Sequence, residues 1–287
     1  MRILIFGSTG LLGKALLSEQ PKTHQVVGLG SKDADIRAVA QVSEVISQHA
    51  PDYIILAAAY TDVDGCETNR QLAWDVNCAG AVHVARSAAL AGARLAFLST
   101  DYVFDGAKRT PYEAEDARAP TTVYGKTKAD AEEQILQLAP DSLVVRTSWV
   151  FGVGGKCFPE TMLRLAQTKA EIAVVDDQRG CPTYTIDLAR ALYLLIDRGA
   201  RGIVHATNQG DCTWFEFADE IMRQASLAVR ILPTTSERFL RPARRPKYSV
   251  LSPRSAEKLG VELPPWKDAL RRYLAQRSDS TLRVADT

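Results

Sequence analysis

A glycine-rich loop separates the first apolar run of this 287-residue chain from its first amphipathic segment. The run at residues 2–6 is rich in Ile and Phe, and the segment at residues 11–19 has helical character. Between them, the loop has the spacing G-x-x-G-x-x-G, which allows a tight turn and a close approach of backbone N–H groups to a diphosphate. An ordinary glycine-rich turn is the alternative, but the strand–loop–helix placement favours a dinucleotide site. Its expected contacts are Gly7, Thr9, Gly10, Leu11, Leu12 and Gly13.

The rest of the first half alternates short apolar runs with longer amphipathic segments. The runs expected as strands are at 25–29, 52–56, 95–98 and 142–146, and the segments expected as helices are at 36–49 and 71–91. Continuous apolar runs are typical of strands buried on both faces, and their alternation with helices indicates parallel βαβ units. We therefore expect an α/β fold: a Rossmann-type doubly wound parallel sheet with a smaller C-terminal substrate-binding region.

The pattern becomes less regular after about residue 150, where prolines interrupt it. We expect residues 1–150, together with about 186–208, to form the dinucleotide-binding domain. The substrate-binding region is expected at about 151–185 and 209–277. Residues 278–287 are polar and are expected to form a flexible tail.

Composition excludes several kinds of protein. Lys and Arg total 35 and Asp and Glu total 34, so the chain lacks the excess of positive charge that nucleic-acid or membrane-surface binding needs. Five scattered cysteines without a C-x-x-C pair argue against a disulfide framework or a zinc cage and favour a reducing cytosol. The N-terminal apolar run is too short for a signal peptide, and no stretch of about 18 apolar residues suggests a membrane span. A cytoplasmic protein is expected.

The second expected strand ends at Gly30 without a carboxylate at its tip. Dinucleotide folds often carry an acidic residue about 20 positions after the glycine loop, where it holds the adenine ribose. Ser31 and Lys32 could instead accept a 2′-phosphate, which favours NADP(H). An exposed Ser-Lys pair is also ordinary in a loop.

Tyr124 and Lys128 are four residues apart at the start of an amphipathic helix and so project from one face. A nearby cation favours the phenolate and lowers the pKa of a tyrosine from about 10. The pair could therefore protonate an alkoxide as a hydride reaches a carbonyl, and Lys128 could also hold a ribose hydroxyl. Tyr-x-x-x-Lys is common by chance, but its combination with the glycine loop favours catalysis.

The segment 99–106 follows directly on the strand expected at 95–98. Ligands of doubly wound sheets bind outside the carboxyl ends of the strands. Ser99 or Thr100 could therefore donate a hydrogen bond to a substrate carbonyl beside Tyr124. The alternative is a hydroxyl that caps a strand-exit loop.

These motifs together resemble those of the extended short-chain dehydrogenase/reductase superfamily and, within it, the dTDP-4-dehydrorhamnose reductase family. The resemblance covers nearly the whole chain, and its more specific segments are 57–64, 99–106, 146–152, 177–183 and 245–249. It implies reduction of the C4 ketone of dTDP-4-dehydro-β-L-rhamnose to dTDP-L-rhamnose by NADPH, with NADH as the alternative. Other functions left open are another sugar-nucleotide ketoreductase, an epimerase, or a non-catalytic regulatory subunit. Intact Thr100, Tyr124 and Lys128 argue against the last.

The resemblance also implies site residues by position. Thr100 would orient the carbonyl, Tyr124 would donate the proton, and Lys128 would hold the nicotinamide ribose. The other cofactor contacts would be Asp35 and Ile36 near the adenosine, and Ala57, Ala58, Ala59 and Tyr60 after the third strand. The substrate contacts would be Thr61, Val63, Thr100, Asp101, Tyr124, Trp149 and Arg245. For Trp149, burial in the core is an equal alternative.

The basic stretch 238–247 holds five cations and no acid. Because arginine offers a planar fork to phosphate oxygens, we hypothesise that Arg245, with Arg241 as a second candidate, meets the substrate diphosphate. A solvated basic loop is the alternative.

Three positions depart from the family pattern. Leu11 stands where the family often has Gln, and Tyr248 where it usually has Asn. Some relatives hold a metal between subunits through an acidic residue early in the first helix, where this chain has Lys14, so no metal is expected. The chain is expected to be a monomer or a homodimer.

Overall fold

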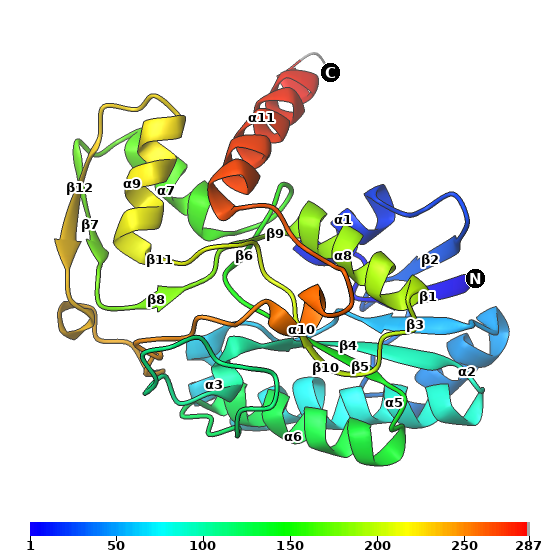
Figure 1. Ribbon diagram of the computed structural model, residues 1–287. Coiled ribbons are helices and arrows are strands. Elements are labelled where there is room, and N and C mark those ends of the chain that lie inside the picture. The colour runs from blue at the N-terminus through cyan, green and yellow to red at the C-terminus, as the bar shows by residue number, and fades with distance from the viewer. Residues whose placement is uncertain (286–287) are drawn as a thin grey trace.

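The structure of the chain, a computed structural model, describes residues 1–285. Its centre is a six-stranded parallel sheet in the order β10-β5-β4-β3-β1-β2 (Figure 1). The strands are β1 (Arg2–Phe6), β2 (Gln25–Leu29), β3 (Tyr53–Leu56), β4 (Arg94–Thr100), β5 (Leu143–Thr147) and β10 (Gly202–His205). From β1 the chain adds β2 on one side and β3 on the other, so the strand order reverses there. That reversal creates the crevice in which doubly wound folds bind ligands, and the expected α/β class is confirmed.

Helices cover both faces of the sheet (Figure 1). Helices α1 (Leu11–Ser18) and α8 (Thr185–Asp197) pack together on one face, and α2 (Val39–His49), α5 (Gly80–Leu90) and α6 (Val123–Leu138) lie on the other. Within β1, Ile3 and Ile5 belong to the first of these cores and Leu4 and Phe6 to the second. Burial on both faces explains why the strands are continuous apolar runs rather than alternating ones.

The segment expected as one helix at 71–91 is helical but not uniform. It comprises α4 (Arg70–Trp74), a π-helical turn (Asp75–Ala79) and α5, and α3 (Val63–Thr68) precedes it. The widened turn places the Asn77 side chain beneath the loop that follows β3.

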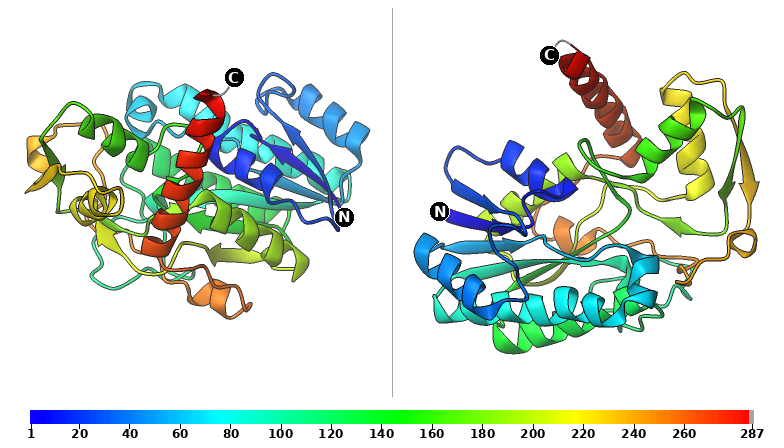
Figure 2. Two further views of the ribbon diagram at one scale, coloured as in Figure 1. Left: turned by 90° about the horizontal axis from the view of Figure 1, so that it is seen from above. Right: turned by 180° about the vertical axis from the view of Figure 1, so that it is seen from behind.

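The C-terminal region is built from short paired strands and three larger helices. Its strand pairs are β6 (Val150–Phe151) with β9 (Thr183–Tyr184), β7 (Glu171–Val175) with β12 (Arg230–Thr234), and β8 (Arg179–Gly180) with β11 (Cys212–Thr213). The helices are α7 (Phe158–Ala166), α9 (Trp214–Gln224) and α11 (Trp266–Ala285), with the short helix α10 (Arg254–Glu257) and the 3-10 turn Ser236–Arg238. In the sheet layer, a further 3-10 turn, Asp101–Val103, follows β4. Figure 2 shows α11 standing out from the body.

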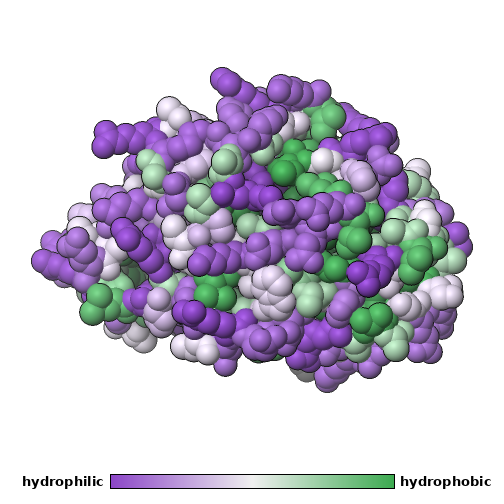
Figure 3. Space-filling model, turned by 90° about the horizontal axis from the view of Figure 1, so that it is seen from below, coloured by the Kyte–Doolittle hydropathy of each residue, from purple (hydrophilic) through white to green (hydrophobic). Residues whose placement is uncertain are grey.

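Strand β10 and helix α8 join the sheet layer although they follow much of the C-terminal region in sequence. The division into two domains stays a prediction. Helix α11 continues to Ala285, so the flexible tail expected at 278–287 also stays a prediction, and residues 286–287 lie outside the described residues. Hydrophilic residues cover most of the face that carries α5 and α6 (Figure 3). Within residues 1–285, no helix is long and apolar enough to cross a membrane.

Candidate functional site

The glycine loop has a backbone that larger residues could not adopt. Gly7 has φ +92°, and a Cβ at Gly13 would lie only 2.2 Å from the Gly7 carbonyl oxygen. Helix α1 begins just after Gly10, which has no side chain to cap the first turn. The N–H groups of that turn are therefore left to an external anion, and a dinucleotide diphosphate fits this geometry.

A carboxylate does lie at the tip of β2, contrary to the sequence analysis. Asp33 Oδ2 accepts the N–H of Gly30 at 2.7 Å, because the chain turns back on itself after the strand. Ser31 and Lys32 are exposed beside it, as a 2′-phosphate site would require. Asp35 is held by Arg37, whose guanidinium keeps the pKa of this carboxyl below its usual value.

Asn77 organises the loop after β3, where Ala57, Ala58, Ala59 and Tyr60 are expected to meet the cofactor. Its Oδ1 accepts the Tyr60 N–H at 2.7 Å, and its Nδ2 donates to the Tyr60 carbonyl at 3.0 Å and to Thr127 Oγ1 at 3.3 Å. These bonds tie the loop to α6. No motif in the sequence points to Asn77, because its partners Tyr60 and Thr127 are distant in the chain.

Thr100 and Tyr124 meet at the carboxyl end of β4, and Lys128 lies one turn further along α6. Thr100 ends β4, while Tyr124 and Lys128 share one face of α6, whose first turn is capped by the Thr122 hydroxyl. Burial raises the pKa of Tyr124, and a hydrogen bond with Thr100 partly opposes that rise. The direction is opposite to the expected lowering by Lys128, because loss of solvent around the phenol dominates. Tyr124 therefore stays protonated at neutral pH.

Lys128 is an unusual buried cation. Its side chain is 2% exposed, and Nζ lies 3.9 Å from the centre of the Phe97 ring. Burial lowers its pKa to about 7, and the nearby Glu132 carboxylate opposes the change. An ammonium of this kind gains from hydroxyl acceptors, such as those of a ribose, that enter the site with a ligand.

The Ser99 hydroxyl is hydrogen-bonded to a residue away from Tyr124. Its hydroxyl donates to Glu132 Oε1 at 2.5 Å, and Glu132 also receives two hydrogen bonds from Arg146. Of the two hydroxyls that the sequence left open, Thr100 is thus the one that faces Tyr124 and Asp101. Asp101 is 2% exposed, and burial raises its pKa to about 6.

Trp149 packs against a second indole. It has φ +46°, which is strained for a non-glycine residue, and its ring stacks on Trp214 with centroids 3.5 Å apart and an interplanar angle of 5°. One face of the ring is therefore covered by protein. A sugar contact through the remaining surface stays a prediction.

Arg245 is anchored to the α3 segment. Both of its terminal nitrogens bind the Asp64 carboxylate, with Nη2 at 2.7 Å from Oδ2, and this pairing keeps the pKa of Asp64 low. The Ala243 N–H also donates to Asp64, and Arg241 Nη1 lies 3.7 Å away. The expected diphosphate contact stays a prediction, and Asp64, which the sequence analysis did not single out, joins the basic stretch to the sheet layer beside Thr61 and Val63.

Two residues that depart from the family pattern, Leu11 and Tyr248, make contacts within the protein. Leu11 approaches Gly155, and Tyr248 packs against the cluster of Phe104, Tyr112 and Leu251. In the described part of the chain, no group of three or more His, Cys, Asp or Glu side chains could hold a metal ion.

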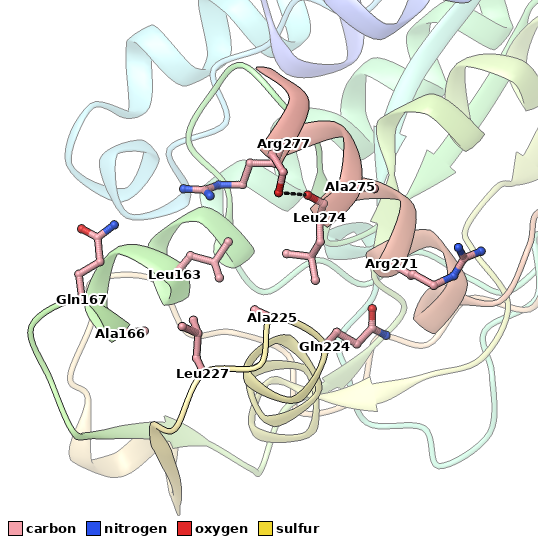
Figure 4. Close-up of a pocket in the computed structure, with 11 residues that line it drawn as sticks. Leu163, Ala166, Gln167, Gln224, Ala225, Leu227, Arg271, Leu274, Ala275 and Arg277 are labelled. Atoms are coloured by element: carbon pink, nitrogen blue, oxygen red, sulfur yellow. Dashed lines mark hydrogen bonds between the residues drawn. The ribbon is translucent and has the colours of Figure 1, made fainter. Parts of the chain in front are cut away.

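A separate cavity of about 550 Å³ lies between α7, α9 and α11 (Figure 4). Leu163, Leu227 and Leu274 point into it, and Gln167, Gln224 and Arg271 lie at its rim. It contains none of the expected catalytic or cofactor residues, so it is distinct from the site around Tyr124.

Comparison with known proteins identifies a matching family and several similar proteins. The sequence model of the RmlD substrate binding domain matches residues 1–278. The chain is 41% identical to the spore coat polysaccharide biosynthesis protein SpsK of Bacillus subtilis, over 97% of this chain and 99% of that protein. It is 42% identical to a dTDP-4-dehydrorhamnose reductase of Mycobacterium tuberculosis, over 98% of this chain and 94% of that protein. A dTDP-4-dehydrorhamnose reductase of Bacillus anthracis, solved in complex with NADP, superposes with a TM-score of 0.93 at 38% identity, covering 96% of this chain and 99% of that one.

Proposed function

Because the chain belongs to the RmlD substrate binding domain family, we propose that it is an NADPH-dependent reductase of a dTDP-linked 4-keto-6-deoxy sugar. Its substrate is dTDP-4-dehydro-β-L-rhamnose and its product is dTDP-L-rhamnose. The observation that supports the proposal is the contact between Thr100, at the end of β4, and Tyr124 on α6, in a chain about 40% identical to reductases of this name over nearly its whole length.

The chain's own groups hold the cofactor and manage the proton. NADPH, when bound, supplies the hydride that adds to the carbonyl carbon. The first turn of α1 receives the diphosphate, and the exposed Ser31 and Lys32 meet the 2′-phosphate. Lys128 holds the nicotinamide ribose, because its buried ammonium needs hydroxyl acceptors.

Tyr124 is the proton donor. As the carbonyl oxygen gains negative charge, the O–H bond of Tyr124 breaks and its proton passes to that oxygen, which becomes the product hydroxyl. The raised pKa keeps the phenol protonated and ready to donate. The phenolate that results is stabilised by the positive charge of Lys128 and regains a proton from solvent.

The substrate enters from the C-terminal region. Thr100 orients the ketone, Trp149 packs against the sugar, and Arg245 provides positive charge for the diphosphate. A related sugar-nucleotide ketoreductase remains the alternative, because Tyr248 replaces the usual Asn. We further propose that the protein works in the cytoplasm, as a monomer or a homodimer, since its five cysteines are free thiols and it needs soluble nucleotide substrates.

The proposal is tested by measuring NADPH oxidation through the decrease in NADPH absorbance. dTDP-4-dehydrorhamnose made in situ should be turned over at least about tenfold more efficiently than UDP- or GDP-linked ketosugars, since losing base contacts costs about 1.4 kcal/mol or more. Efficient turnover of another ketosugar would change the substrate, and no turnover of any would overturn the reductase.

A further inference from the structure

We propose that Asp101 is a positioning residue whose protonation decides whether the Thr100 hydroxyl and the Tyr124 phenol point toward the substrate carbonyl. The inference rests on the proposed function and deepens it, because it concerns how the reducing site is made ready for the ketone.

The carboxyl of Asp101 is enclosed beside Thr100. Thr100 ends β4, and Asp101 opens the 3-10 turn that follows it. Thr100 Oγ1 lies 3.0 Å from Asp101 Oδ1 and also accepts the Tyr102 N–H at 3.2 Å. Asp101 Oδ2 is buried and makes no hydrogen bond of normal geometry. Thr100 therefore holds Oδ1, and the Ser249 hydroxyl is a second hydroxyl beside the carboxyl.

A threonine hydroxyl has one hydrogen and two lone pairs, which limits what Thr100 can do. The Tyr102 N–H occupies one lone pair. When Asp101 is ionised, its Oδ1 takes the only hydrogen of Thr100, and the Tyr124 O–H turns to the lone pair that is left. Neither hydroxyl then offers a hydrogen to a ketone.

A protonated Asp101 reverses the arrangement. Its own O–H donates to Thr100, so both lone pairs of Thr100 are occupied, one by Asp101 and one by the Tyr102 N–H. The hydrogen of Thr100 is then free to point away from Asp101. The Tyr124 phenol finds no acceptor at Thr100, so its hydrogen is directed to the substrate oxygen. The protonated carboxyl thus prepares the reactive geometry.

Burial makes Asp101 easier to protonate than an exposed aspartate. Burial raises its pKa to about 6, while the hydroxyls of Ser249 and Thr100 lower it. The titratable groups that face it are Tyr102 from the same 3-10 turn, Tyr124 from α6, and Cys181 from the segment between β8 and β9. None of these three is a cation. Arg245, which lies near Tyr102, is already paired with Asp64.

An amide mimics the protonated carboxyl, and this provides the test. We expect kcat/KM for the ketosugar to fall in the wild type above a pKa of about 6, because kcat/KM reports the free enzyme. Asp101→Asn should lack this fall and keep kcat/KM within about tenfold of the acidic wild-type value, whereas Asp101→Val should lose about 100-fold or more. Asp105→Asn is the matched control, since Asp105 lies in the same loop but pairs with Tyr112, and it should keep the wild-type fall.

Two results would overturn the proposal: a fall of wild-type size in Asp101→Asn, or an Asp101→Asn that folds normally but is as inactive as Asp101→Val. A second measurement does not need turnover. In protein labelled with ¹³C-aspartate, the Asp101 carboxyl resonance, identified by its absence in Asp101→Asn, should titrate near 6, and a titration near the ordinary value of about 4 would refute the proposal. If the wild type reduces no ketosugar, the proposed function fails and the titration still decides the state of Asp101.

Discussion

Glu132 and Arg146 form a two-point ion pair inside the protein. Arg146 Nε lies 2.9 Å from Glu132 Oε1 and Nη2 lies 2.7 Å from Oε2, and neither side chain is more than 1% exposed. Glu132 stands one helical turn after Lys128 on α6 and also binds Ser99. The pair therefore lies next to Lys128, and the Glu132 carboxylate acts on the charge of that lysine.

Removing one partner of this pair should be costly. Glu132→Gln leaves the Arg146 guanidinium buried without its counter-charge, and we expect the free energy of unfolding to fall by about 3–5 kcal/mol. The double variant Glu132→Leu, Arg146→Met should recover part of this loss, because it removes the buried Arg146 charge together with its partner. Urea unfolding followed by circular dichroism measures both. A single variant as stable as the wild type would contradict the assignment.

His205 should make the fold sensitive to acid. It is fully buried 3.4 Å from Arg146 Nη1, and burial together with that cation lowers its pKa to about 3. An unfolded histidine has a pKa of about 6.5, so between these values the unfolded state binds the extra proton. The stability is therefore complete above about pH 6.5 and is lost as the pH falls toward 3.

His205→Gln removes this linkage. Between pH 7 and pH 5, the free energy of unfolding of the wild type should fall by about 2 kcal/mol more than that of the variant. His49→Gln, in the last turn of α2, is the control and should behave as the wild type. Equal pH dependence in wild type and His205→Gln would show that His205 does not drive the acid sensitivity.

Burial of Lys128 should lower the free energy of unfolding of the cofactor-free protein. Its pKa is lowered to about 7 in the folded state, so the unfolded chain binds the extra proton between about pH 7 and 10.5. The cost is fully present below pH 7 and disappears above pH 10.5. Lys128→Met should therefore be inactive yet more stable at pH 7, by on the order of 3 kcal/mol, and the gain should shrink as the pH rises. Thermal unfolding at several pH values measures this difference. A Lys128→Met variant that is less stable than the wild type at every pH would contradict the expectation.

Arg245→Ala should weaken sugar-nucleotide binding. Losing a charge-assisted contact to a diphosphate costs about 1.5–3 kcal/mol, which corresponds to a rise in the KM for the ketosugar of about tenfold or more. The KM for NADPH should not change. Arg244→Ala, which removes the exposed neighbouring cation, should leave both values within about twofold. An unaltered sugar-nucleotide KM in Arg245→Ala would remove Arg245 from the substrate site.

Local patterns predicted five of the six strands of the sheet, and β10 was not among the strands expected from the sequence. Strands β1 and β2 begin and end where their apolar runs do, and a glycine follows each run. Strand β1 is buried on both faces, whereas β2 is an edge strand whose residues are mostly exposed or half-buried. The interruption of the helix expected at 71–91 could not be predicted, since helical periodicity does not distinguish a π-helical turn from an α-helical one. That turn is set by the tertiary contacts of Asn77 with Tyr60 and Thr127.

The candidate site was predictable where its residues lie close in sequence. The glycine loop and the Tyr124–Lys128 pair are local motifs, and the structure places them as expected. The partners of Arg245 and Arg146 are distant in the chain, and no spacing rule connects Asp64 to a residue 181 positions later. The direction of the Tyr124 pKa shift was wrong for a related reason: spacing identifies a neighbouring charge but not the depth of burial.

The central claim is that Tyr124 protonates the carbonyl oxygen of a dTDP-linked ketosugar, and single-turnover reduction by wild type and Tyr124→Phe tests it most directly. The substitution keeps the ring that packs 5.7 Å from Tyr102 and removes only the hydroxyl. With NADPH and dTDP-4-dehydrorhamnose, we expect the rate of reduction to fall about 100- to 10,000-fold while both ligands still bind. Reduction by Tyr124→Phe at the wild-type rate would contradict the account.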